Sequence, residues 1–305
     1  SLNSWINFRN ISDLNTGLNF LDSIPKQFSN IKKIQKIFAH CYFDSPKTDE
    51  MFRQLTSNPD VNYSRYLFFH SNYLILRNNE EEAKKNIKSS VLRYPKNLLL
   101  NQLKIDYEKK KVFNNKFDCK NISDVIAEIF YVVSNGLSAQ NNIIASNFYL
   151  NLAKYLNPNF VSFDELYAEN FFLIQEYEES KKIYSEIKKR GSFYSWHASK
   201  QIASILNKQE KKKDAINTLK KSFEKIVNPT TYEIFDYAKF LKNNEKYKES
   251  IKYYSKVLNL IEPKNALYAQ VMDGRGTAYE RTDQWGKAEE DLLNSLKVSP
   301  DDAYV

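Results

Sequence analysis

The sequence predicts an all-α protein built from antiparallel helix pairs that repeat along the chain. Three observations predict this fold class: glycine and proline are scarce, the prolines recur at a fixed interval, and small and bulky residues alternate at helical spacing. The 305 residues include only 6 glycines and 8 prolines, fewer than glycine-rich parallel sheets or turn-dense β proteins need. Apolar residues make up 42% of the chain, enough to fold, and the length favours two domains or an elongated repeat array.

The prolines mark a repeating unit. They stand at positions 25, 46, 59, 95, 158, 229, 263 and 300, and without the second of them the intervals are 34, 36, 63, 71, 34 and 37 residues. These intervals are one or two multiples of about 34 residues. Because proline ends a helix, the interval predicts a helical unit that ends at a fixed point.

Within each unit, small and bulky residues follow one another at helical spacing. Two units with identical spacings are Leu67, Ser71, Leu74, Ala83, Ile87, Ser90, Pro95 and Met272, Gly276, Tyr279, Ala288, Leu292, Ser295, Pro300. A small residue on each of two adjacent helices admits the bulky residue of its partner, so each unit predicts an antiparallel helix pair. Four more units have their small first-helix residue at Ser134, Ala168, Ala203 and Ala238.

One segment breaks this rhythm and suggests the domain organisation. The stretch 107–123 (YEKKKVFNNKFDCKNIS) has no helical apolar period, which predicts a polar linker or long loop; a degenerate repeat is the alternative. We therefore expect N-terminal helical repeats at 1–106, degenerate except for the unit at 67–95, and a C-terminal array at 124–305. Since the chain starts at Ser1 without a methionine and ends five residues after Pro300, we expect a fragment whose array is truncated and whose targeting segment is missing.

No catalytic, cofactor or metal site is predicted. Gly274 and Gly276 form a Gly-x-Gly, but Tyr279 stands where a dinucleotide fingerprint needs its third glycine. The 3 histidines lack partners at metal-ligand spacing. The 2 cysteines, Cys41 and Cys119, are too few for a disulfide framework, and Cys41 is interpreted as a small core residue. No run approaches about 18 apolar residues, so no transmembrane segment is expected.

The net charge of +8 raises the question of an anionic partner. The run at 208–225 holds seven lysines and three acids, but its cluster at 211–213 falls at a hairpin turn. Nucleic-acid binding would need such charge on a groove-facing stripe with interleaved aromatic or arginine side chains. A solvated turn is therefore the preferred interpretation, and nucleic acid is not the expected partner.

The repeating pattern resembles the tetratricopeptide repeat, whose 34-residue helix-turn-helix unit has these residue types at these spacings. The segment 276–292 (GTAYERTDQWGKAEEDL) matches best and is similar to bacterial members of the family. The resemblance covers about 67–95 and 124–305 well and 1–60 loosely. It implies a right-handed α-solenoid, or superhelix, of about eight antiparallel helix pairs. Arg275 and Lys212 depart from the family's apolar or aromatic positions, so we expect their helix pairs to pack less tightly.

The architecture suggests where a partner binds. In stacked helix pairs the first helices line a concave groove, and side chains three places before and one, four or five places after each small residue point into it. This reasoning predicts the partner-binding residues Phe68, Asn72, Ile75, Tyr131, Asn135, Glu165, Glu169, Phe172, Lys200, Phe235, Lys239 and Lys242. For the aromatic members, packing between neighbouring first helices is the alternative.

The predicted function is a non-catalytic protein-protein interaction scaffold that binds a protein or peptide in this groove, with no cofactor. The sequence does not name the partner. The family's lysine and asparagine clamp for acidic peptide C-termini is absent from these positions. One alternative is a helical-repeat protein that binds nucleic acid or an anionic surface through its lysines, and another is a regulatory module of an enzyme that continues beyond Val305. We expect a bacterial protein of the cytoplasm or cell envelope, and self-association through the repeat ends stays open.

Overall fold

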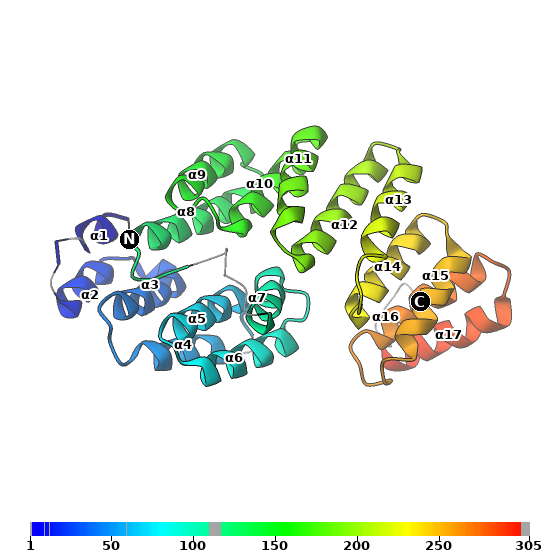
Figure 1. Cartoon of the computed structure of the whole chain (residues 1–305), viewed down its shortest axis with the longest axis horizontal. Coiled ribbons are helices and arrows are strands. Elements are labelled where there is room, and N and C mark those ends of the chain that lie inside the picture. Colours follow the sequence, from blue (N-terminus) through cyan, green and yellow to red (C-terminus); the bar gives the residue numbers. More distant parts are fainter. Residues whose placement is uncertain (1, 9, 12, 59, 110–116, 300–305) are drawn as a thin grey trace. The chain divides into compact units, whose positions relative to one another are not determined.

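The computed structural model describes residues 2–299 except 9, 12, 59 and 110–116. These residues form 17 α-helices and 2 short 3-10 helices and contain no strand, which confirms the all-α prediction (Figure 1). The chain divides into two compact units, Ser1–Ala198 (unit 1) and Ser199–Val305 (unit 2). The predicted end of the array after Pro300 lies outside the described residues.

Unit 1 holds eleven complete α-helices and the start of a twelfth, with a 3-10 turn (η1) before the third and another (η2) after the eleventh. They are α1 (Leu2–Phe8), α2 (Leu14–Asp22), η1 (Lys26–Phe28), α3 (Ser29–Tyr42), α4 (Thr48–Ser57), α5 (Ser64–Leu76), α6 (Glu80–Arg93), α7 (Leu98–Glu108), α8 (Ile122–Ala139), α9 (Ile143–Leu156), α10 (Val161–Leu173), α11 (Tyr177–Ile187) and η2 (Lys188–Arg190). The boundary between the units falls inside α12 (Ser192–Lys208). Unit 2 continues with α13 (Lys212–Phe223), α14 (Thr231–Asn243), α15 (Tyr247–Leu258), α16 (Tyr268–Glu280) and α17 (Trp285–Val298).

The helix pairs form where the small residues predicted them. Ser71, Ser134, Ala168, Ala203 and Ala238 are each fully buried on the first helix of a pair. The small residues of the second helices are buried as well, and in two pairs the contact is a direct hydrogen bond. Ser134 and Ser146, for example, each donate a hydroxyl proton to the other's backbone carbonyl, at 2.6 and 2.9 Å. Small side chains thus let α8 and α9 approach closely, as the repeat pattern requires.

The turn inside each pair is also repeated. Six turns contain one residue with φ between 55° and 64°, the left-handed region: Asn78, Asn141, Gln175, Glu210, Glu245 and Asp283. The next residue then donates its N–H to the carbonyl of the bulky residue of the pattern, as from Asn79 to Leu74 at 3.0 Å. This is the hydrogen bond of a Schellman motif, which satisfies a carbonyl at the helix end. The bulky residue therefore serves both the core and the turn.

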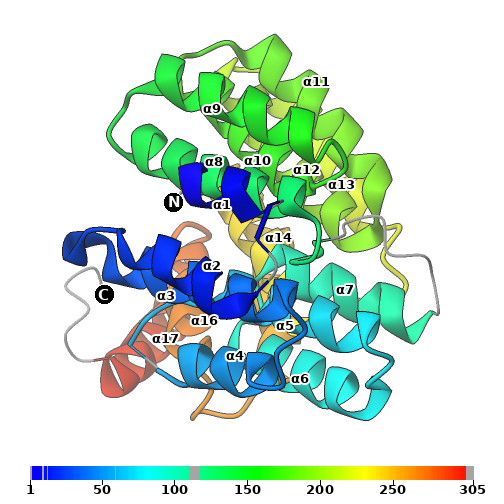
Figure 2. The ribbon, with the colours of Figure 1, turned by 90° about the vertical axis from the view of Figure 1, so that its left-hand side faces the viewer.

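Helix α8 is the centre of unit 1. It packs against α9, its partner in the repeat, and also against α1 from the other end of the unit. Figure 2 shows α1 lying beside α8, while α2 to α7 form a separate stack below them. A disulfide between Cys41 of α3 and Cys119, with Cα atoms 5.9 Å apart, ties the two groups of helices together. The burial of Cys41 fits its interpretation as a core residue, but the sequence did not reveal that Cys41 pairs with Cys119.

The predicted linker at 107–123 lies inside unit 1, and residues 110–116 of it are outside the described residues. Helix α7 continues to Glu108, and the segment after the gap is anchored in the core. Phe117 is 3% exposed and stacks on Phe69 of α5 with ring centroids 3.9 Å apart. Together with Cys119, which is also buried, Phe117 holds the segment that leads into α8.

Arg275, expected to loosen its helix pair, bonds three helices instead. Its guanidinium donates to both carboxylate oxygens of Asp291 on α17, at 2.6 and 2.8 Å, and to the hydroxyl of Ser255 on α15, at 3.0 Å. Asp291 is 3% exposed. A planar guanidinium that binds a carboxylate with two bonds compensates for the missing apolar side chain.

The close packing of unit 2 can be tested at Gly274. A methyl group at this position would lie 2.5 Å from the ring of Tyr254, which is 1% exposed and has little space to move. We expect Gly274→Ala to lower the free energy of unfolding of unit 2 by about 1–3 kcal/mol, measured by urea denaturation. Gly286→Ala is the control, because nothing lies within 4 Å of its added methyl group. Equal midpoints for both variants would argue against tight packing between α15 and α16.

Candidate functional site

The predicted groove residues of α5 are covered. Phe68 is 1% exposed, and its ring lies against Phe160 with centroids 6.0 Å apart. Asn72 is 5% exposed and donates its side-chain N–H to the carbonyl of Phe68 at 2.9 Å. Ile75 is half-buried. In this conformation a partner cannot reach Phe68 or Asn72, and the aromatic ring packs between helices as the alternative interpretation has it.

Four of the predicted residues lie on two successive first helices of unit 1, and three of them, Tyr131, Glu165 and Glu169, are near one another. Tyr131 and Asn135 come from α8, and Glu165 and Glu169 come from α10, the next first helix. Asn135 and Glu169 are exposed, while Tyr131 and Glu165 are half-buried. We call these four residues, with His197 of α12, the acidic surface.

Tyr131 is fixed by its neighbours. Its ring lies 5.5 Å from the ring of Phe163, and the guanidinium of Arg65 lies 3.9 Å from its centroid. Burial raises the pKa of Tyr131 to about 12, although the charge of Arg65 acts in the opposite direction. The phenol therefore stays neutral at the edge of the acidic surface and can donate a hydrogen bond.

The two glutamates of α10 differ in their surroundings. Glu165 has its Oε1 3.1 Å from Nε2 of His197. Although Glu169 as a whole residue is exposed, neighbouring groups surround its carboxyl closely enough that desolvation, together with the nearby charge of Glu165, raises its pKa to about 7. Glu169 is therefore only partly ionised at neutral pH.

The raised pKa of Glu169 predicts a pH dependence of stability. Its carboxyl binds a proton more tightly in the folded chain than in the unfolded chain, so between about pH 4.5 and 7 the folded state carries more protons. Stability then falls as the pH rises through this range. We expect Glu169→Gln to flatten this part of the curve, measured by urea denaturation at a series of pH values. Glu186→Gln, an exposed control on α11, should leave the slope unchanged, and equal slopes for all three proteins would contradict the assignment.

The other predicted residues are Phe172 at the end of α10 and four residues of unit 2. Phe172 packs against Tyr177 of α11 with ring centroids 5.7 Å apart. In unit 2, Lys200 forms an ion pair with Asp236, and Phe235 is 3% exposed and lies against Tyr254. Lys239 is exposed and Lys242 is half-buried on α14. Binding by these residues stays a prediction.

The histidines and acids of the described part of the chain do not form a metal site. Within this part, no set of three or more histidine, cysteine, aspartate or glutamate side chains lies together in a way that would hold a metal ion. The buried histidine, His70, donates from Nε2 to a carboxylate oxygen of Asp49 at 2.7 Å, and its ring stacks on Phe52. This contact joins α4 to α5, so the role that it indicates for His70 is structural.

Helix α8 has the length and composition of a membrane span. Its 18 residues reach a mean hydropathy of 1.2, and one third of them are buried inside the protein. It was not expected to span a membrane, because its apolar run is interrupted. Two acids, Asp124 and Glu128, interrupt it, and Glu128 is 1% exposed and bonded to Arg65. A core helix of a helical protein passes the same test of length and composition.

The sequence analysis did not identify the buried ion pair next to the acidic surface. Arg65 on α5 donates to the carboxylate of Glu128 on α8 through three hydrogen bonds of 2.5 to 3.0 Å. The apolar segment 122–139 contains two acids, Asp124 in the first turn of the helix and Glu128 farther inside it. An acid inside an apolar helix is a signal of a buried partner, and this signal was available. Nothing in the sequence marks Arg65 as that partner, because the two residues are 63 positions apart.

Comparisons with known proteins find the fold and no close relative. No family model and no curated protein matches the chain. Among solved structures it is similar to YrrB, described as a TPR protein with an unusual peptide-binding site, at 17% identity over 57% of this chain and 87% of that one, with a TM-score of 0.40. It is also similar to PilF of Pseudomonas aeruginosa (11% identity, 79% and 94% covered, TM-score 0.41) and to yeast Tom70 (13%, 93% and 59%, TM-score 0.46). At these values the likeness concerns the helical-repeat fold alone.

Proposed function

We propose that this chain, a helical-repeat protein of the tetratricopeptide type, is a non-catalytic interaction scaffold that binds a peptide segment of another protein on the acidic surface of unit 1. One observation carries the proposal. Tyr131 of one first helix lies near Glu165 and Glu169 of the next. Asn135 follows Tyr131 by four residues, on the same face of α8, and both Asn135 and Glu169 are exposed. Successive first helices are where a stack of helix pairs presents side chains to a partner.

The chemistry of this surface favours a peptide with a cationic side chain. Two carboxylates close together disfavour each other's ionisation, as the raised pKa of Glu169 indicates. A lysine or arginine between them would stabilise both charges. The amide of Asn135 can donate to and accept from a peptide backbone, and the phenol of Tyr131 can donate to it.

The test measures binding of labelled peptides to the full chain by fluorescence anisotropy. Three pools of equal length are compared, one rich in lysine and arginine, one rich in aspartate and glutamate, and one uncharged, together with duplex DNA. We expect binding of the cationic pool alone, which weakens as the pH falls below about 7 and Glu169 becomes protonated. The double variant Asn135→Ala/Glu169→Gln should weaken it by about tenfold or more, since hydrogen bonds to charged groups contribute about 1.5–3 kcal/mol.

The control carries the same substitutions on second helices. Asn151 of α9 and Glu186 of α11 are both exposed, so Asn151→Ala/Glu186→Gln should bind like the parent. The proposal is wrong if both double variants bind equally well. Binding of DNA with an affinity that falls steeply with salt would instead support the alternative, binding of nucleic acid through lysines.

A further inference from the structure

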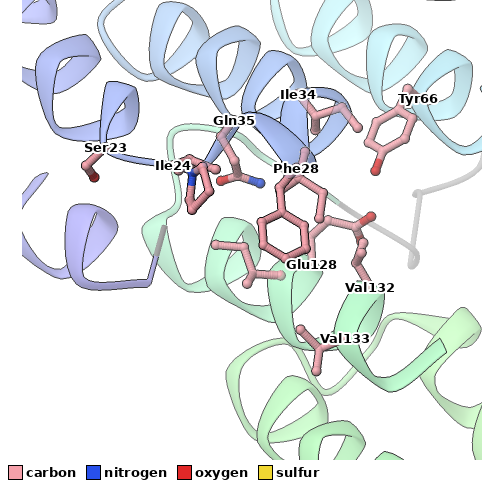
Figure 3. A pocket seen from close by; sticks show the side chains of 12 residues that line it. Ser23, Ile24, Phe28, Ile34, Gln35, Tyr66, Glu128, Val132 and Val133 are labelled. Atoms are coloured by element: carbon pink, nitrogen blue, oxygen red, sulfur yellow. The ribbon is translucent and has the colours of Figure 1, made fainter. Parts of the chain in front are cut away.

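A cavity of about 310 Å³ lies in unit 1 between the α2–α3 region, α5 and α8. Its walls are mostly apolar, with Ile24, Phe28 and Ile34 on one side and Ile129, Val132 and Val133 of α8 on the other. Figure 3 shows these side chains converging from the two sides. The cavity is about twice as large as one that binds benzene, and its volume is at the lower end of the range for small-molecule sites.

Besides Ser23, whose hydroxyl donates to the carbonyl of Phe20, two side chains with hydrogen-bond donors line this cavity. Gln35 is 3% exposed, and its side-chain oxygen accepts a hydrogen bond from the indole N–H of Trp5. That bond fixes the amide, and no acceptor for its nitrogen Nε2 lies within hydrogen-bonding distance among the described residues. The hydroxyl of Tyr66 likewise has no hydrogen-bond partner in the described part of the chain, and in Figure 3 it points toward Glu128. Both donors face the cavity, where water can reach them, so an oxygen of a ligand that takes the place of this water can accept from them.

The charges of the cavity decide which acceptor fits. The lining residues include one carboxylate, that of Glu128, and no lysine, arginine or histidine. Arg65 is already bonded to Glu128 and cannot compensate a second anion. A carboxylate on a ligand would therefore enter an apolar space beside another carboxylate, at a large cost in desolvation. A neutral oxygen avoids this cost.

We propose that this cavity binds a small neutral molecule with an apolar body and one hydrogen-bond-accepting oxygen, such as a ketone or an ester. The body lies among the isoleucine, valine and phenylalanine side chains, and the oxygen accepts from Nε2 of Gln35 and the hydroxyl of Tyr66. An apolar side chain of a partner protein would fill the space but leave Nε2 of Gln35 without an acceptor. The site is separate from the acidic surface, and the proposal does not rest on peptide binding.

Three compounds of similar shape test the proposal on the full chain: acetophenone, ethylbenzene and benzoate. The readout is the indole N–H signal of Trp5 in NMR spectra, one of 3 tryptophan signals, because Trp5 bonds to Gln35. We expect acetophenone to shift this signal saturably, ethylbenzene to bind about fivefold more weakly because it makes no hydrogen bond, and benzoate to leave the signal unchanged. Benzoate binding as tightly as acetophenone, or no saturable shift with either neutral compound, overturns the proposal.

Two variants separate the cavity from unspecific binding. Val132→Phe fills the cavity and should abolish the shift, whereas Ile144→Phe adds the same ring at a side chain of α9 that is 88% exposed and should change nothing. Tyr66→Phe keeps the shape of the wall and removes one donor. It should lower the affinity for acetophenone part of the way to that for ethylbenzene, because Nε2 of Gln35 remains as a donor, and leave ethylbenzene binding unchanged. An unchanged affinity for acetophenone in Tyr66→Phe would show that the oxygen does not lie where we place it.

Discussion

Replacing Glu128 with alanine is expected to lower the free energy of unfolding of unit 1 by about 3–5 kcal/mol. The variant leaves the guanidinium of Arg65 without its anion, in a position where the side chain is 16% exposed. The group is enclosed by the rings of Tyr131, Phe160 and Phe69, with centroids at 3.9, 4.9 and 5.2 Å. These rings favour a cation but do not replace the three hydrogen bonds to a carboxylate.

Hydrogen exchange is the suitable measurement, because it reports on α5 and α8 separately from unit 2. Glu82→Ala is the matched control. It breaks the ion pair of Arg53 and Glu82, whose side chains are 51% and 37% exposed, and exposed pairs contribute less than about 1 kcal/mol. The double variant Arg65→Met/Glu128→Leu should recover most of the stability, because apolar side chains can replace a buried ion pair. Equal protection of α8 in the Glu128 and Glu82 variants would contradict a structural role for the buried pair.

Removal of the disulfide is expected to cost about 4 kcal/mol in unit 1. Cys41 and Cys119 are 78 positions apart, and a cross-link that closes a loop of this length strongly restricts the unfolded chain. The bond also joins α3 to the segment that leads into α8. Both cysteines are buried, at 2% and 3% exposure, so alanines at these positions introduce no unpaired polar group.

The measurement compares urea midpoints of the parent and of Cys41→Ala/Cys119→Ala, each with and without a reducing agent. We expect the reducing agent to lower the midpoint of the parent to near that of the variant, and to leave the variant itself unchanged. Coincident midpoints for all four samples would mean that the cross-link does not stabilise unit 1.

The repeat pattern predicted the fold well where contacts are local. Small residues such as Ser134 and Ala168 are buried at the helix-helix contacts, as their spacing required. Each of these contacts joins helices that follow one another in the chain, so their residues recur at a fixed interval. The left-handed turn residues recur in the same way. The residue after each of them donates its N–H to the carbonyl of the bulky residue that precedes the turn.

The contacts of α8, and of the segment that leads into it, with α5 could not be predicted in this way. They join residues far apart in the chain, such as Arg65 with Glu128 and Phe69 with Phe117. These contacts do not repeat, so no period reveals them. For the same reason Phe68 was expected to face a groove, whereas its ring packs against Phe160 of the loop before α10. Asn135 and Glu169 occupy repeat positions that are exposed in the described part of the chain, and binding by them stays a prediction.

The most direct test of the proposed function is photo-cross-linking from the acidic surface. A photoreactive amino acid is placed at Asn135 of α8 or at Asn151 of α9, both exposed, and the full chain is irradiated with the cationic peptide pool. The account predicts cross-linked peptide from position 135, which an excess of unlabelled peptide competes away, and little from position 151. Equal cross-linking at both positions, or none at position 135 under conditions where the peptides bind, would contradict peptide binding at this surface.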